Sequence, residues 1–179
     1  SRIMVTEYAP ELLAEELGER LCNPQTLVMS GVTDPYQPVE RRLQITRRCL
    51  EVLARFRNPV GIITNNQLVT RDIDLLGELA AHRAAAVNIS ITSLDPKLQR
   101  VLEPRTSTPR ARLEAIQQLR AAGSPVGVMT APIIPGLTRH TVPATPEAAS
   151  QARAALSLIP ALRRPSAGPP LCHRRRLGG

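Results

Sequence analysis

Residues 86–91 (A-V-N-I-S-I), followed directly by residues 92–95 (T-S-L-D), decide the fold that this sequence predicts. The first segment predicts a buried, apolar strand, and the second predicts a polar turn at its carboxyl end. Another polar segment, residues 102–106 (L-E-P-R-T), follows shortly afterwards. Parallel α/β sheets and barrels hold their ligands at the carboxyl ends of their strands. We therefore expect a functional site where this strand ends.

Comparable patterns lie on both sides of this segment. The apolar runs predict strands over 26–30, 60–64, 86–91 and 125–130, and the intervening segments predict helices over 10–20, 39–56, 71–82 and 109–123. We expect Thr70 to cap the third helix, and Thr108 with Pro109 to form the N-cap and first position of the fourth. Apolar strands alternating with helices indicate a parallel sheet. The expected fold is α/β, a partial (β/α) barrel incomplete at both ends, with a doubly wound sheet as the alternative.

Charge separates the chain into two parts. The formal net charge of the 179 residues is +8, but residues 151–179 contain six arginines and no acidic residue. Residues 1–150 therefore carry 17 basic and 15 acidic side chains, a net charge of +2, which gives no electrostatic basis for nucleic-acid binding. Residues 143–179 are rich in Ala, Pro and Arg, and we expect a disordered or weakly helical tail beyond a barrel domain of residues 1–142.

The sequence lacks the features of membrane-spanning, disulfide-linked and zinc-binding proteins. No apolar run approaches the roughly 20 residues that span a bilayer, and no signal-peptide pattern is present, so we expect a cytoplasmic protein without a membrane partner. The three cysteines, Cys22, Cys49 and Cys172, lack the spacing of a disulfide framework or a zinc site. No metal ligand and no catalytic residue can be assigned from spacing alone.

Polar side chains follow all four predicted strands: Thr33 and Asp34, then Thr64, Asn65 and Asn66, then Ser90, Thr92, Ser93 and Asp95, then Thr130 and Pro132. Each residue alone is explained equally well as a helix cap or a turn residue. Their convergence on one edge of the sheet indicates a shared functional site in addition to these local roles. From the residues alone, we expect a small polar ligand at the rim of a partial barrel.

Six segments in order resemble the radical SAM proteins related to spore photoproduct lyase, over about residues 1–142: 31–40 (G-V-T-D-P-Y-Q-P-V-E), 64–72, 89–95, 102–106, 112–116 and 132–137. This resemblance implies a barrel in which a C-x3-C-x2-C loop holds a 4Fe-4S cluster, and the cluster binds S-adenosylmethionine. Reductive cleavage of that cofactor yields a 5′-deoxyadenosyl radical, which abstracts hydrogen from the substrate.

The resemblance also implies roles for individual residues. Thr33 and Asp34 would contact the methionine amino group of S-adenosylmethionine, and Asn65 its carboxylate. Ser90 and Thr92 would contact the ribose or the carboxylate, and Pro132 with Ile133 would shape the adenine pocket. For Arg105 and Arg112, a structural role, such as pairing with Glu103, and substrate contact remain open.

The chain departs from the family pattern at several positions. It lacks C-x3-C-x2-C, it has Asn65 where the lyases have Lys, and neither Gly31 nor Val32 is the cysteine that donates hydrogen in thymine-dimer repair. The family continuation is also lost from about Arg139. We therefore expect an inactive fragment of a radical SAM enzyme, whose tail comes from a shifted reading frame. The alternatives are a non-catalytic, partner-binding barrel fragment with a basic tail, and a different barrel enzyme acting on a phosphorylated or keto substrate.

Overall fold

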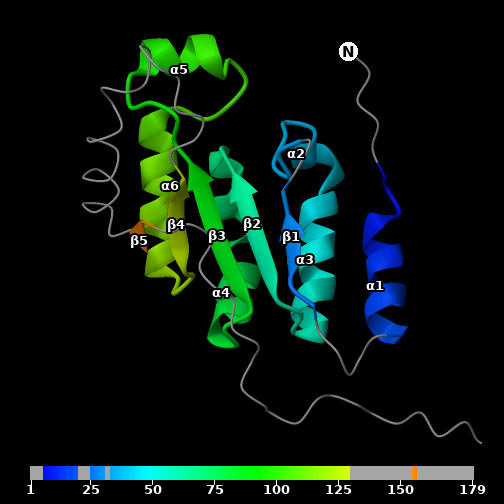
Figure 1. Cartoon of the computed structure of the whole chain (residues 1–179). Helices are drawn as coiled ribbons and strands as arrows, with labels where there is room; N and C mark the ends of the chain where they lie inside the picture. The colour runs from blue at the N-terminus through cyan, green and yellow to red at the C-terminus, as the bar shows by residue number, and fades with distance from the viewer. Residues whose placement is uncertain (1–5, 20–24, 31–32, 130–154, 157–179) are drawn as a thin grey trace, which may run out of the picture.

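The computed structural model describes residues 6–19, 25–30, 33–129 and 155–156. The helices are α1 (Ala9–Glu19), α2 (Glu40–Leu43), α3 (Ile45–Phe56), the 3-10 helix η1 (Gln67–Asp72), α4 (Ile73–Ala81), α5 (Pro96–Leu102) and α6 (Pro109–Ala121). The strands are β1 (Leu27–Met29), β2 (Val60–Thr64), β3 (Ala85–Ser90), β4 (Val126–Met129) and β5 (Ala155–Leu156). Figure 1 shows the strands side by side, with α5 beyond the carboxyl end of β3.

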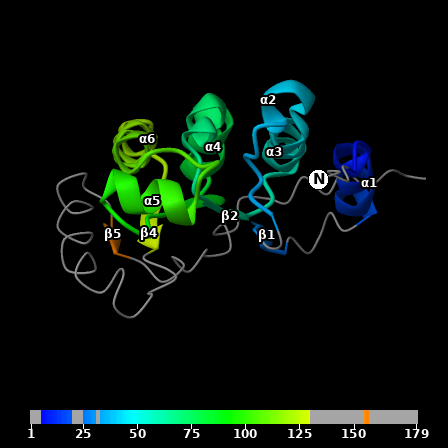
Figure 2. The same cartoon turned by 90° about the horizontal axis from the view of Figure 1, so that it is seen from above.

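The strands form one parallel sheet in the order β1-β2-β3-β4-β5. Helices α3, α4 and α6 lie on the same side of this sheet (Figure 2). The described strands follow chain order, as in a (β/α) barrel, and show no reversal of the kind that defines a doubly wound sheet. The predicted parallel α/β fold and the partial barrel are therefore confirmed.

The hydrophobic core lies between the sheet and the helices. Alternate strand residues point to opposite faces, so one set packs against the helices and the other set faces the inside of the partial barrel. The core residues from the strands are Val60, Ile62, Ala85, Val87, Ile89, Val126 and Val128, and those from the helices include Leu50, Leu53, Leu76, Leu79, Ile116 and Leu119. This packing fixes which strand residues are left to face a ligand.

The single helix predicted over residues 39–56 is wrong, because the chain breaks at Gln44. This residue adopts φ 50°, in the left-handed region, and its N–H closes α2 on the carbonyl of Glu40. The helix restarts as α3 at Ile45. Thr46 then donates its hydroxyl to the carbonyl of Pro35 at 2.6 Å, which ties α3 to the loop after β1.

The start of the helix predicted over 71–82 is also different. The chain first forms η1, capped by Asn66, whose side chain accepts a hydrogen bond from the N–H of Leu68 at 3.0 Å. Thr70 caps nothing, since its hydroxyl donates back to the carbonyl of Gln67. Thr108 does cap α6 by accepting from Ala111, as predicted.

Two further elements were not predicted. Helix α5 begins after Asp95, which accepts a hydrogen bond from the N–H of Lys97 at 2.8 Å. Residues 155 and 156, in the segment expected to be a disordered tail, pair with β4 as β5. The rest of residues 143–179 lies outside the described residues. Among the residues the structure describes, no helix is long and apolar enough to cross a membrane.

Candidate functional site

Asp34 joins the loop after β1 to the end of β2. Its carboxylate accepts hydrogen bonds from the Thr64 hydroxyl at 2.7 and 2.9 Å, from the Asn65 N–H at 2.8 Å and from the Tyr36 N–H at 2.7 Å. Three donor groups therefore occupy a carboxylate that offers about four lone-pair positions. Asp34 therefore braces the rim, and about one of its acceptor positions receives no donor from the described residues.

The two neighbouring asparagines after β2 have different surroundings. Asn66 is built into the scaffold, because its side-chain oxygen accepts from the Leu68 N–H and from the Ser107 hydroxyl at 3.2 Å. Asn65 is half-buried, and its side chain makes no hydrogen bond to any residue in the described ranges. Thr33, in the loop after β1, is exposed. Asn65 and Thr33 are thus the rim side chains that the scaffold leaves available.

Arg112 connects α6 to the end of β3 and to the loop before α6. Its side chain is 1% exposed, and it donates to the carbonyl of Ser90 at 2.7 Å, to the carbonyl of Ser107 at 2.9 Å and to the hydroxyl of Thr106 at 2.6 Å. It also forms a short ion pair with Glu103. Of the two roles left open for Arg112, the structure shows the structural one.

Glu103 extends this connection to the polar turn after β3. Its carboxylate accepts a hydrogen bond from the Thr92 hydroxyl at 2.8 Å and also contacts Thr106. Thr92 and Ser90 therefore both lie beside the Arg112–Glu103 pair. Arg105, in the same loop, is exposed and has no ion pair within the described part of the chain.

Several of the predicted rim residues belong to one hydrogen-bond network. It runs in the order Asp34, Thr64, Asn66, Ser107, Arg112, Glu103 and Thr92. The convergence expected for the ends of the first three strands is therefore found, with Ser107 as the link that sequence reasoning missed. Thr130 and Pro132 lie outside the described residues.

A second network, next to the first, was also missed by sequence reasoning. The buried carboxylate of Asp72 pairs with Arg71 at 2.8 Å and with Arg47 at 3.0 Å, and Arg71 also reaches Glu40 at 2.9 Å. Burial raises the pKa of the Tyr36 phenol well above its ordinary value, and the Asp72 carboxylate raises it further. Tyr36 and Glu40 both belong to the segment 31–40. This segment therefore supplies residues that support the rim.

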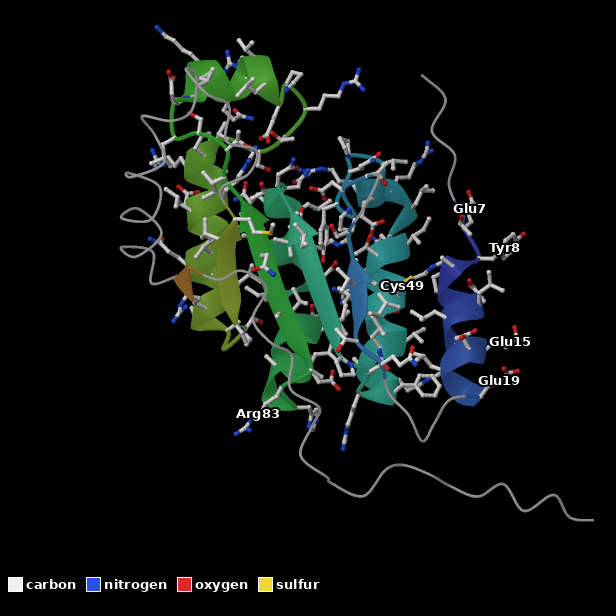
Figure 3. All side chains as sticks on the ribbon, viewed as in Figure 1. Glu7, Tyr8, Glu15, Glu19, Cys49 and Arg83 are labelled. Atoms are coloured by element: carbon white, nitrogen blue, oxygen red, sulfur yellow. The ribbon has the colours of Figure 1, made fainter. Side chains whose placement is uncertain are left out.

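The described part of the chain offers no ligand set for an iron-sulfur cluster. No group of three or more His, Cys, Asp or Glu side chains in it is placed to hold a metal ion. Cys49 lies on α3 where this helix faces α1 (Figure 3), and burial raises the pKa of its thiol to about 11. A thiol that stays protonated is a poor metal ligand. Cys22 and Cys172 lie outside the described residues.

Comparison with known proteins gives relatives of greater length. The chain is 35% identical over 138 residues to an uncharacterized protein of Mycobacterium tuberculosis, and the match covers 77% of this chain and 41% of that protein. The chain thus spans about two fifths of the length of this curated relative.

Solved structures of similar fold include those of spore photoproduct lyase. A mutant with dinucleoside spore photoproduct gives a TM-score of 0.57 at 20% identity, and covers 79% of this chain and 41% of the lyase. A second mutant, with bound AdoMet (S-adenosylmethionine) and dinucleoside spore photoproduct, gives the same TM-score of 0.57 at 18% identity, with coverages of 79% and 41%. A family model described as the radical SAM superfamily matches residues 2–149. The chain therefore belongs to the radical SAM superfamily.

Proposed function

We propose that the carboxyl edge of β1, β2 and β3 binds S-adenosylmethionine. The observation that carries this proposal is the single hydrogen-bond network that holds the rim residues together in a chain of this superfamily. A preformed rim reduces the ordering that a ligand must impose when it binds. One of the similar lyase structures contains the same cofactor, which supports the choice of ligand.

The available groups match the amino-acid end of the cofactor. The ammonium group needs acceptors, and the remaining lone pair of Asp34 with the hydroxyl of Thr33 supplies them. The carboxylate needs donors, and the amide of Asn65 supplies one without the charge of the lysine found in the lyases. We assign Ser90, at the end of β3, and Thr92, in the turn after it, to the ribose or the carboxylate. We assign Pro132 to the adenine pocket on the family resemblance alone.

The cluster does not fit the residues of this chain. In the family, S-adenosylmethionine bound to a reduced 4Fe-4S cluster supplies a 5′-deoxyadenosyl radical. The three cysteines of this sequence do not form the C-x3-C-x2-C motif. We infer that this chain binds S-adenosylmethionine without cleaving it, and that cleavage needs cluster ligands from outside these 179 residues. We propose a cytoplasmic location on the family membership alone, since radical SAM enzymes are typically soluble.

We propose that the substrate of this protein is not the thymine dimer that the lyases repair. Gly31 and Val32 stand at the positions where the lyases carry their hydrogen-donating cysteine. Without that thiol, this loop lacks the hydrogen donor that the lyases use. We therefore do not assign thymine-dimer repair to this chain.

Titration calorimetry of the intact protein with S-adenosylmethionine tests the proposal. Asn65→Ala should raise the Kd by about 10-fold or more, because a hydrogen bond to a charged group contributes about 1.5–3 kcal/mol. Its free energy of unfolding should stay within about 0.5 kcal/mol of wild type, since the side chain supports nothing else.

Asn66→Ala is the matched control. It should lower the free energy of unfolding by about 1 kcal/mol through loss of the cap, and raise the Kd by less than Asn65→Ala does, because its side chain supports the rim without contacting the cofactor. The proposal is wrong if the intact protein does not bind S-adenosylmethionine, or if Asn65→Ala binds it as tightly as wild type.

A further inference from the structure

Helix α1 presents one face that the described part of the fold does not cover. The members of this outer face are Tyr8, Leu12, Glu15 and Glu19. Their spacing of four, three and four residues places them along one side of a helix. The other side of α1 carries Leu13 and Leu17, which pack against the core, and α1 lies against α3. Figure 3 shows Tyr8, Glu15 and Glu19 on the side of α1 that faces away from α3.

The first half of the outer face is apolar. Tyr8 is 75% exposed and Leu12 is 58% exposed, and both are among the large hydrophobic side chains that the fold leaves in water. The N–H of Leu12 donates to the carbonyl of Tyr8 at 3.1 Å, so the two residues lie on successive turns. This half offers an apolar contact to a partner.

The second half of the outer face is acidic. Glu15 and Glu19 are exposed, and neither forms an ion pair within the described ranges. Like charges four residues apart on a helix repel each other. Glu19 also lies in the last turn of α1, which contains no basic residue, although the helix dipole favours a cation there. This half therefore fits a cationic partner.

The chain itself contains a segment with this order of chemistry. Residues 171–177 read L-C-H-R-R-R-L, so Leu171 is followed by the arginine run 174–176. From residue 171 to residue 176 an extended chain spans about 17 Å. From Tyr8 to Glu19 a helix rises by about 16 Å. The apolar residue and the arginine run thus match the two halves of the outer face in length as well as in charge.

The chain between β5 and this segment is long enough to reach α1. Figure 1 and Figure 2 show β5 and α1 at opposite ends of the molecule. Strand spacings of about 4.8 Å across the sheet, with helix spacings of about 10 Å beyond it, put α1 roughly 40 Å from β5. The stretch of about 15 residues from Leu156 to Leu171 spans up to about 50 Å when extended.

The size of the outer face favours a segment of this chain over a separate protein. Four residues on one helix cover much less than the roughly 800 Å² per partner that a stable complex of separate proteins buries. A tethered segment needs less, because the tether gives it a high effective concentration. We propose that residues 171–177 of the same chain dock on the outer face of α1, with Leu171 on its apolar half and the arginine run on its acidic half. This inference does not depend on the proposed function.

A spin label within the segment tests the proposal in the full chain. Cys172 takes a nitroxide label in a Cys22→Ser variant. Cys49 stays unlabelled, because it is only 7% exposed and burial raises the pKa of its thiol to about 11. In nuclear magnetic resonance spectra, a nitroxide broadens the amide signals of residues close to it. The signals of α1 should be broadened, and reduction of the nitroxide should restore them.

Helix α6 is the internal control for this measurement. It packs against β4, and β4 pairs with β5, so α6 lies near the point from which the segment is tethered. A segment that does not dock would broaden the signals of α6 more than those of α1, because α1 lies at the far end of the molecule. The proposal predicts the reverse order.

Charge variants and salt test the chemistry of the contact. Replacing both outer-face glutamates, Glu15→Gln with Glu19→Gln, should abolish the broadening of α1. Glu78→Gln is the matched control, since Glu78 is an exposed glutamate on α4 and should leave the broadening unchanged. Replacing the arginine run 174–176 with glutamine repeats the test without altering α1. Salt at about 1 M, where the Debye length is about 3 Å, should also abolish the broadening.

Several results would overturn the inference. It fails if α1 shows no broadening, if α6 is broadened at least as strongly, or if the charge variants and high salt leave the broadening of α1 unchanged. A mixture of spin-labelled protein with an isotope-labelled copy that carries no nitroxide identifies the source of the segment. Broadening of α1 in this mixture would place the segment on a neighbouring copy and overturn its assignment to the same chain.

Discussion

Replacing Arg112 with methionine removes the connection between α6, the end of β3 and the loop before α6. The guanidinium group holds the carbonyls of Ser90 and Ser107 and the carboxylate of Glu103, whose side chain is only 18% exposed. Methionine fills a similar volume without replacing any of these bonds. Breaking a buried ion pair costs about 3–5 kcal/mol, because the remaining charge is left without compensation.

We expect a loss near the lower end of that range, about 3 kcal/mol, since water reaches part of Glu103. A domain is stable by about 5–15 kcal/mol in total, so this single change removes a large fraction of the stability. Adding Glu103→Gln to Arg112→Met should recover about 1–2 kcal/mol, because the stranded charge is gone.

Urea unfolding of the intact protein, followed by circular dichroism, measures these changes. Arg110 provides the control on the same helix, since it is 90% exposed and pairs with Glu114 four residues later at 2.9 Å. Arg110→Met should cost no more than about 0.5 kcal/mol. If Arg112→Met is no more destabilising than Arg110→Met, the structural role assigned to the buried pair is refuted.

Two further predictions concern the second network. Arg47 lowers the pKa of the Asp74 carboxyl through hydrogen bonds at 2.8 and 3.1 Å. The stability that this pair contributes is therefore present above the unfolded pKa of about 3.9, and it is lost as the pH falls through the pKa of the folded state. Asp74→Asn should therefore lower the free energy of unfolding by about 0.5 kcal/mol at neutral pH, because the carboxylate is mostly exposed, and should not change it in acid. Urea midpoints at the two pH values measure this difference. An equal loss at both pH values would contradict the prediction. For Tyr36, the raised pKa means that only the unfolded chain ionises this phenol as the pH passes about 10. In a Tyr8→Phe variant, the ultraviolet signal of phenolate should appear together with unfolding, and its appearance in the folded protein would count against the buried position of Tyr36.

The features of the fold that could be predicted are those carried by local sequence. Apolar runs located all of β1 to β4, and the regular alternation of strands and helices predicted a parallel sheet. The cap at Thr108 was predictable because threonine followed by proline has a direct physical role at a helix start. The polar residues after the strands were predictable because strand ends share an edge.

The remaining features depend on contacts between distant residues. Gln44 has no intrinsic preference for the left-handed conformation, so the break between α2 and α3 left no signal. Ser107 and Arg112 join the rim only because α6 packs beside η1 and β4.

The most direct test of the central claim is an anaerobic co-crystal structure of the intact protein with S-adenosylmethionine. The account predicts the methionine end of the cofactor at the rim, with its amino group at Asp34 and Thr33 and its carboxylate at the Asn65 amide. Cofactor bound away from the carboxyl edge of β1 and β2, or crystals that take up none at saturating concentration, would contradict it.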